Sequence, residues 1–98
     1  MNNLIQNVIE WARTRNLLDN DPKAQYIKLQ EEAGELARAI LKNDTLEQKD
    51  SIGDMLVVLI ILAKQLNTSV EECLEIAWNE IKDRKGTTVD GVFIKEEK

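Results

Sequence analysis

The 98-residue sequence contains no histidine and a single cysteine, and these two scarcities exclude several kinds of site. Without histidine there is no Ser-His-Asp or Cys-His catalysis and no zinc site built on imidazole. Cys73 has no partner for an internal disulfide, which suits a reducing compartment, so we expect a cytoplasmic protein. Because Cys73 falls in an apolar stripe, we expect a buried thiol rather than a nucleophile. Residues 1–4 lack the basic start and apolar block of a signal peptide.

Aromatic residues, proline and glycine are also scarce, with two Trp, one Tyr, one Phe, one Pro and four Gly. Leu, Ile, Val and Ala must therefore fill the interior, and few loops are expected. The charged fraction of 32% and the many helix-forming residues indicate a soluble helical protein. The net charge is −5, and no cluster of Lys and Arg is large enough to bind duplex nucleic acid.

No apolar run is long enough to cross a membrane, since the longest, Met55–Ala63, has nine residues and a span needs about 20. We therefore expect no membrane partner. On a helix, such a run indicates burial on every side. A subunit of this size can hardly cover the helix alone, so we expect another subunit to do so, in a homodimer or homotetramer.

The spacing of apolar residues predicts an all-α fold: a four-helix bundle with a short C-terminal β-hairpin, forming one domain over residues 1–98. Asp21-Pro22 predicts a helix start, and Thr45 with Gln48 and Ser69 with Glu72 predict two capping boxes. Asp90-Gly91 between β-branched residues predicts the hairpin turn, within residues 87–94. The expected helices are Asn3–Arg15, Asp21–Lys42, Thr45–Leu66 and a fourth from Ser69, with Gly86 as its C-cap.

Two groups of carboxylates stand on the expected second and third helices. Residues three or four apart share a helix face, so the members of each group repel one another unless a cation neutralises them. Oxygen ligands of this type favour Mg²⁺ or Mn²⁺. Gly34 and Gly53 lie among the carboxylates and suggest two helices packed closely around a shared site. The carboxylates are Glu31, Glu32, Glu35, Asp50 and Asp54.

An ordinary interpretation stays open for the glutamates, because a charge run is usually a solvated face, here partnered by Lys28 and Arg38. Asp54 is harder to explain in this way, since it adjoins the apolar run and needs a partner if it is buried. Trp11 and Trp78 are more typical of a core than of base stacking.

A second polar group, at the end of the expected fourth helix, contains Asn79, Lys82, Arg84 and Lys85. Its cations could hold an anionic ligand. They could equally oppose the helix macrodipole at its C-terminal end.

Taken together, two motifs resemble the MazG-like family of all-α nucleoside triphosphate pyrophosphohydrolases, in its small phage-type members. The motifs are Glu31-Glu32-Ala33-Gly34-Glu35 and Asp50-Ser51-Ile52-Gly53-Asp54, and the segment 77–93 adds to the likeness. The resemblance implies catalytic roles for Glu32 and Glu35 and a Mg²⁺ site (Mn²⁺ as an alternative) at Glu31, Glu32, Glu35, Asp50 and Asp54. It implies substrate contacts from Lys28, Asn79, Lys82, Arg84 and Lys85. One departure is Ser51, where the family has Glu.

We therefore expect Mg²⁺-dependent hydrolysis of nucleoside triphosphates to monophosphates and pyrophosphate, as in cleaning of the nucleotide pool. Two alternatives stay open. Ser51 favours a nucleotide-binding or regulatory module that has lost hydrolysis. The run Met55–Ala63 favours a purely structural oligomerisation domain.

Overall fold

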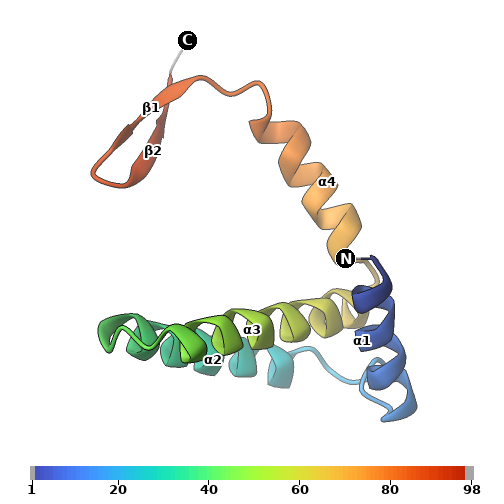
Figure 1. The fold of residues 1–98 in the computed structure, drawn as a ribbon. Helices are drawn as coiled ribbons and strands as arrows, with labels where there is room; N and C mark the ends of the chain where they lie inside the picture. The colour runs from blue at the N-terminus through green and yellow to red at the C-terminus, as the bar shows by residue number, and fades with distance from the viewer. Residues whose placement is uncertain (1, 97–98) are drawn as a thin grey trace.

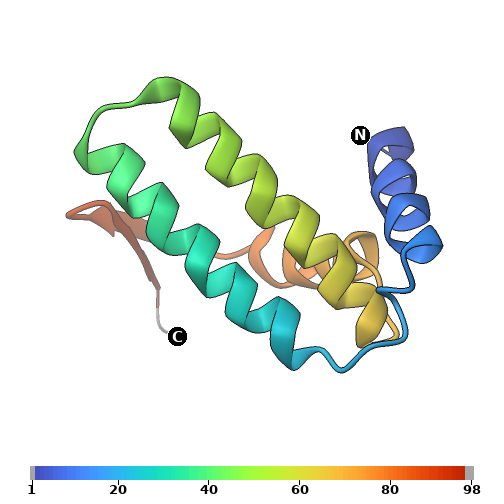
Figure 2. The ribbon, with the colours of Figure 1, turned by 90° about the horizontal axis from the view of Figure 1, so that it is seen from below.

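The structure, a computed structural model, describes residues 2–96 and contains four helices and one two-stranded hairpin. This confirms the expected all-α fold, with 68% of the described residues helical. The elements are α1 (Asn2–Thr14), α2 (Lys23–Leu41), α3 (Thr45–Gln65), α4 (Val70–Ile81), β1 (Gly86–Val89) and β2 (Val92–Lys95). Helices α2 and α3 run antiparallel side by side, and α1 packs against α3 (Figures 1 and 2).

On both α2 and α3, residues that are alternately four and three positions apart face the other helix. On α2 these are Gln25, Leu29, Glu32, Leu36 and Ala39, and on α3 they are Gln48, Ser51, Met55, Val58 and Leu62, all buried or half-buried. This alternation of four and three residues is the spacing by which two helices form a continuous seam. The Gln48 amide donates to the carbonyl of Ala39 at 3.3 Å, which fixes the two helices relative to each other.

The apolar core lies where α1 meets the C-terminal half of α3. Ile5 and Ile9 of α1 pack with Ile60 of α3, and Val8, Leu18 and Val70 close around them. The run Met55–Ala63 is only partly covered: Val58 and Ile61 are buried, but Leu56 and Leu59 are exposed.

Asparagine in the left-handed conformation ends the first three helices. Asn16, Asn43 and Asn67 have φ between 55° and 62°, just past α1, α2 and α3. In each case the next amide donates to a carbonyl five residues back, which is the Schellman motif. These bonds are Leu17 to Ala12, Asp44 to Ala39 and Thr68 to Ala63, at 3.0, 3.0 and 2.9 Å.

Two of the three expected helix starts are shifted. Asp44 caps α3 by accepting from the amide of Glu47 at 3.1 Å, so the Thr45–Gln48 box is wrong by one residue. Asp21 accepts from the amide of Lys23 at 2.8 Å, and α2 begins after Pro22 instead of at it. The third start is confirmed, because Ser69 accepts from the amide of Glu72 at 3.1 Å.

The hairpin has the expected turn, with Asp90 and Gly91 at φ 50° and 80° and Val89 paired with Val92. Both central residues at positive φ are typical of a type I′ turn. Gly86, expected as the C-cap of the fourth helix, is instead the first residue of β1. A Cβ there would clash with the Ile94 carbonyl and lie 2.7 Å from the Phe93 ring.

Beyond residue 70 the chain leaves the α1–α3 body as an arm formed by α4 and the hairpin (Figure 1). Every described residue from 71 to 96 is exposed. The expectation of a buried Cys73 is therefore wrong for the single chain, and Trp11 and Trp78 are about half exposed. None of the helices within residues 2–96 is long and apolar enough to cross a membrane alone. By length and composition, α3 and α4 pass that test only as a pair, which is bent by 99°.

Candidate active site

Glu32 is the only buried carboxylate in the described residues 2–96, at 8% exposure. It lies on the seam between α2 and α3, three residues after Leu29 and four before Leu36. Its pKa is raised from 4.5 to about 7. The largest cause is a hydrogen-bonding interaction with the Glu35 carboxyl, followed by burial and by a similar interaction with Asp54. The structure thus brings Glu32, Glu35 and Asp54 together from two helices.

The other two expected carboxylates are not part of this buried group. Glu31 and Asp50 are exposed and, unlike Glu35 and Asp54, do not affect the pKa of Glu32. The interpretation of the glutamates as a solvated face is wrong for Glu32. Within residues 2–96 the only ion pair joins Glu10 and Arg13, so neither Lys28 nor Arg38 neutralises the cluster.

Ser51 lies on the α3 side of the same seam and is 3% exposed. It stands three residues before Asp54, on the same side of the helix. The hydroxyl therefore lies inside the α2–α3 interface, with a neutral side chain at the position where the family motif has a carboxylate.

Gly34 and Gly53 were expected to allow close approach of the two helices, and that expectation is wrong. A Cβ at either position would have no neighbouring atom within 4 Å. Both glycines face away from the seam and are exposed. The helices instead meet through the seam residues, so the glycines have no packing role in the single chain.

A small polar pocket of about 180 Å³ adjoins the carboxylates where α2 turns into α3. Glu35 lines the pocket, and Arg38 on α2 and Lys42, the residue that follows α2, bring cations to it. Asp44 and Glu47 close the other side. Sequence reasoning treated Arg38 only as a partner of a solvated face and missed Lys42. The sequence signal that could have identified Arg38 and Lys42 was their helical spacing from Glu35.

A family model for the MazG nucleotide pyrophosphohydrolase domain matches residues 21–89, which include both acidic motifs, α2, α3 and α4. The chain belongs to the MazG family. This confirms the resemblance stated from the motifs.

The chain is also similar to a protein of Haemophilus phage HP1 (strain HP1c1), described as an uncharacterized 18.2 kDa protein in the rep-hol intergenic region. The two are 54% identical over 63 residues, which cover 63% of this chain. The match spans 39% of the length of the phage protein. No solved structure matches the chain.

Members of the MazG family generally use divalent metals, so the fit of the carboxylates to a metal can be tested. The donors are of the right type, because Mg²⁺ prefers carboxylate oxygens. In residues 2–96, however, no three acidic or cysteine side chains stand close enough to hold a metal ion between them as placed. Mg²⁺ usually keeps several waters and takes one or two protein carboxylates, and the cluster at Glu32 can supply these.

The expected substrate contacts are not brought to this cluster. Lys28 lies on α2 itself and is exposed. Asn79 lies on α4, which contacts α3 but not α2. Lys82, Arg84 and Lys85, expected on the fourth helix, follow its last residue, Ile81. They lie on the arm, on the segment leading to β1.

Proposed function

We propose that this MazG-family chain is a Mg²⁺-dependent nucleoside triphosphate pyrophosphohydrolase, which releases a nucleoside monophosphate and pyrophosphate. The observation that carries the proposal is the buried carboxyl of Glu32, whose pKa is raised by the carboxyls of Glu35 on the same helix and of Asp54 on α3. A purely structural seam would gain stability from an apolar residue at position 32, since an uncompensated buried charge is costly. An acidic residue there is explained by a cation that binds it.

In this proposal, Glu32 and Glu35 are the catalytic pair. A carboxylate of this pair can accept a proton from the attacking water, as a general base. Water adds across the anhydride bond between the α- and β-phosphates. Its hydroxyl goes to one phosphorus, and its proton goes to the bridging oxygen that leaves. A bound Mg²⁺ would supply charge neutralisation and a more acidic water. One or two carboxylates would hold it, and the proposed candidates are Glu31, Glu32, Glu35, Asp50 and Asp54.

The phosphates need cations as well, and two sources are proposed. Arg38 and Lys42 share the small pocket with Glu35, so they can contact a phosphate held by the acidic cluster. Lys28 on α2 and the arm residues Asn79, Lys82, Arg84 and Lys85 stay proposed contacts to phosphate or sugar. Cleaning of the nucleotide pool, by removal of non-standard nucleotides, is the role we propose for such an activity.

The decisive experiment is a panel of standard and modified (d)NTPs with Mg²⁺ or Mn²⁺, assayed for pyrophosphate. We expect pyrophosphate from at least one of them, and at least 100-fold less from Glu35→Gln. A matched control is Glu71→Gln on α4, an exposed carboxylate on the arm. No pyrophosphate from any nucleotide would refute the proposal. Equal loss of activity in the Glu71 variant would remove the special role of the cluster.

Ser51 favours a second proposal, a nucleotide-binding module without hydrolysis. A neutral, 3% exposed hydroxyl replaces the family's carboxylate, which removes one candidate metal ligand. Nucleotide binding by calorimetry with no pyrophosphate, and turnover gained in Ser51→Glu, would favour this alternative. Full turnover by the wild type would exclude it.

A purely structural oligomerisation domain can be separated from both by its response to metal. A ligand that binds only the folded state raises the melting temperature. We expect Mg²⁺ to raise the melting temperature of the wild type and to have no such effect on Glu35→Gln or Asp54→Asn. A wild type that is insensitive to Mg²⁺ would favour the structural domain.

A further inference from the structure

The small pocket at the turn between α2 and α3 contains two cations without a counter-charge bound to them. Its charged lining residues are Glu35, Arg38, Lys42, Asp44 and Glu47. In the described part of the chain, residues 2–96, the one ion pair lies on α1, so neither Arg38 nor Lys42 is paired with the carboxylates beside it. Both side chains are exposed and can therefore bind an anion from solution.

The two carboxylates at the start of α3 are compensated in another way. Asp44 accepts a hydrogen bond from the amide of Glu47 at 3.1 Å, and Glu47 lies in the first turn of α3. The N-terminal end of a helix carries a partial positive charge that stabilises acidic side chains there. The cations of the pocket are therefore not needed to neutralise Asp44 and Glu47.

The two cations follow the acidic group of the candidate active site along α2. Arg38 stands three residues after Glu35, about 4.5 Å further along the helix axis and on the same side. Lys42 stands about two turns after Glu35 and directly follows the last residue of α2. On α3, Glu47 stands seven residues before Asp54 and so shares its side of the helix. The pocket thus begins about one helical turn from the acidic group.

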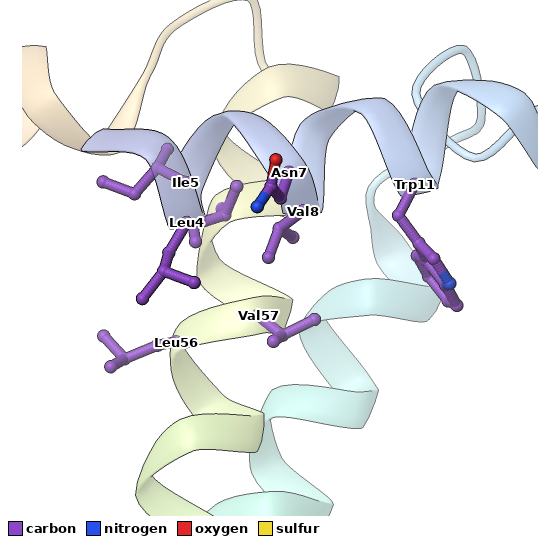
Figure 3. Close-up of a pocket in the computed structure, with 8 residues that line it drawn as sticks. Leu4, Ile5, Asn7, Val8, Trp11, Leu56 and Val57 are labelled. Atoms are coloured by element: carbon purple, nitrogen blue, oxygen red, sulfur yellow. The ribbon is translucent and has the colours of Figure 1, made fainter. Parts of the chain in front are cut away.

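In the opposite direction α3 offers no charge to a phosphate. It leads to an apolar groove of about 570 Å³, where Leu56 and Val57 of α3 point toward Leu4 of α1 (Figure 3). Asn7 is the one polar residue of this lining, and it is neutral. Lys28 is the nearest cation of α2 on this side, compared with two cations at the pocket. A chain of phosphates therefore fits best when it runs from the acidic group toward the pocket.

The size of the pocket also favours a phosphate over a nucleoside. Sites for drug-sized ligands have volumes of about 300–1,000 Å³, whereas this pocket has about 180 Å³.

We propose that Arg38 and Lys42 hold the terminal phosphate of a nucleoside triphosphate and thereby select triphosphates over diphosphates. This inference rests on the proposed hydrolysis between the α- and β-phosphates, which places those two phosphates at the acidic group. The γ-phosphate is the next along the chain and carries about two negative charges near neutral pH. A diphosphate ends at its β-phosphate, so it lacks the charge-assisted hydrogen bonds that the two cations donate.

Binding of non-hydrolysable analogues tests this selection without depending on turnover. The probes are α,β-methylene nucleoside tri- and diphosphates of the four standard bases, titrated in Mg²⁺ by isothermal titration calorimetry. For the base that binds most tightly, the wild type should bind the triphosphate at least about tenfold more tightly than the diphosphate. Arg38→Ala should reduce this ratio to about threefold or less, and Lys42→Ala should lower it as well.

Lys49→Ala is the matched control, because Lys49 is an exposed cation of α3, next to Gln48, that does not line the pocket. It should leave the ratio as in the wild type. The same ratio in the wild type and in Arg38→Ala would overturn the proposal, as would equal binding of tri- and diphosphates by the wild type or binding of no analogue. Lower thermal stability of Arg38→Ala with an unchanged ratio would also overturn it, since the cation would then serve only the C-terminal end of α2.

The pyrophosphate assay separates this proposal from the proposed hydrolysis. Selective binding that depends on Arg38, without release of pyrophosphate, would support the role of the pocket and refute hydrolysis. Release of pyrophosphate with equal binding of tri- and diphosphates would support hydrolysis and overturn the role of the pocket.

Discussion

The buried carboxyl of Glu32 makes the stability of the metal-free chain depend on pH. Its pKa of about 7 in the folded chain exceeds the value of 4.5 for an unperturbed group. Because the pKa is higher in the folded than in the unfolded chain, protonation of Glu32 stabilises the folded chain. This stabilisation is complete below pH 4.5 and is lost as the pH rises through 7. At about 1.4 kcal/mol per unit of pKa shift, protonation of Glu32 contributes about 3 kcal/mol to the free energy of unfolding.

Glu32→Gln should remove this dependence, because glutamine resembles the protonated carboxyl and does not titrate. From the two pKa values, the wild type should lose about 2–3 kcal/mol of unfolding free energy between pH 5 and pH 8 through Glu32 alone. The variant should not, so it should be more stable than the wild type at pH 8 and close to it at pH 5. Urea unfolding followed by circular dichroism, in EDTA and at one fixed chain concentration, measures the difference.

Glu31→Gln is the matched control, since Glu31 is the adjacent carboxylate on α2 and is exposed. It should leave the pH dependence as in the wild type. Parallel pH profiles for the wild type and Glu32→Gln would refute the reasoning, because they would show that Glu32 has the same pKa in the folded and unfolded chain.

Four further predictions concern a helix cap, two glycines and the small pocket. Asp44→Ala should cost about 1 kcal/mol in urea unfolding, and Thr45→Ala much less, since Asp44 accepts from the first turn of α3. Gly34→Ala should stabilise the chain by about 1 kcal/mol, because a Cβ there meets nothing. Gly86→Ala should open the hairpin to hydrogen exchange, because its Cβ meets the Ile94 carbonyl. Arg38→Ala should raise KM for the triphosphate more than it lowers kcat, in steady-state kinetics.

The helices were predictable because local signals agree with the final structure. Apolar periodicity gave all four, and Ser69 and Asp90-Gly91 were correctly assigned to a cap and a turn. The boundaries were less certain, since neighbouring polar residues compete for the same role: Asp44 and Thr45 can both cap a helix, and Asp44 does so. The left-handed asparagines at the ends of α1–α3 were a readable signal, because asparagine tolerates that conformation better than most residues.

Which glutamate is buried was harder to predict, since three are close in sequence and burial depends on where α3 crosses α2. The alternating spacing from Leu29 through Glu32 to Leu36 carries that information. This spacing predicts the burial of Glu32 only if Glu32 is counted as a seam residue despite its charge. Apolar patterns alone assign a glutamate to the solvated face, and for that reason the ordinary interpretation of the run failed at this one residue.

The arm marks the limit of what apolar spacing can tell. Leu74, Trp78 and Ile81 have the spacing of core residues, as do the seam residues of α2. The first set is exposed, whereas the second is buried or half-buried. The hydrophobic effect acts on apolar area without regard to which chain covers it. A sequence therefore specifies that such a stripe must be covered, but not by which molecule.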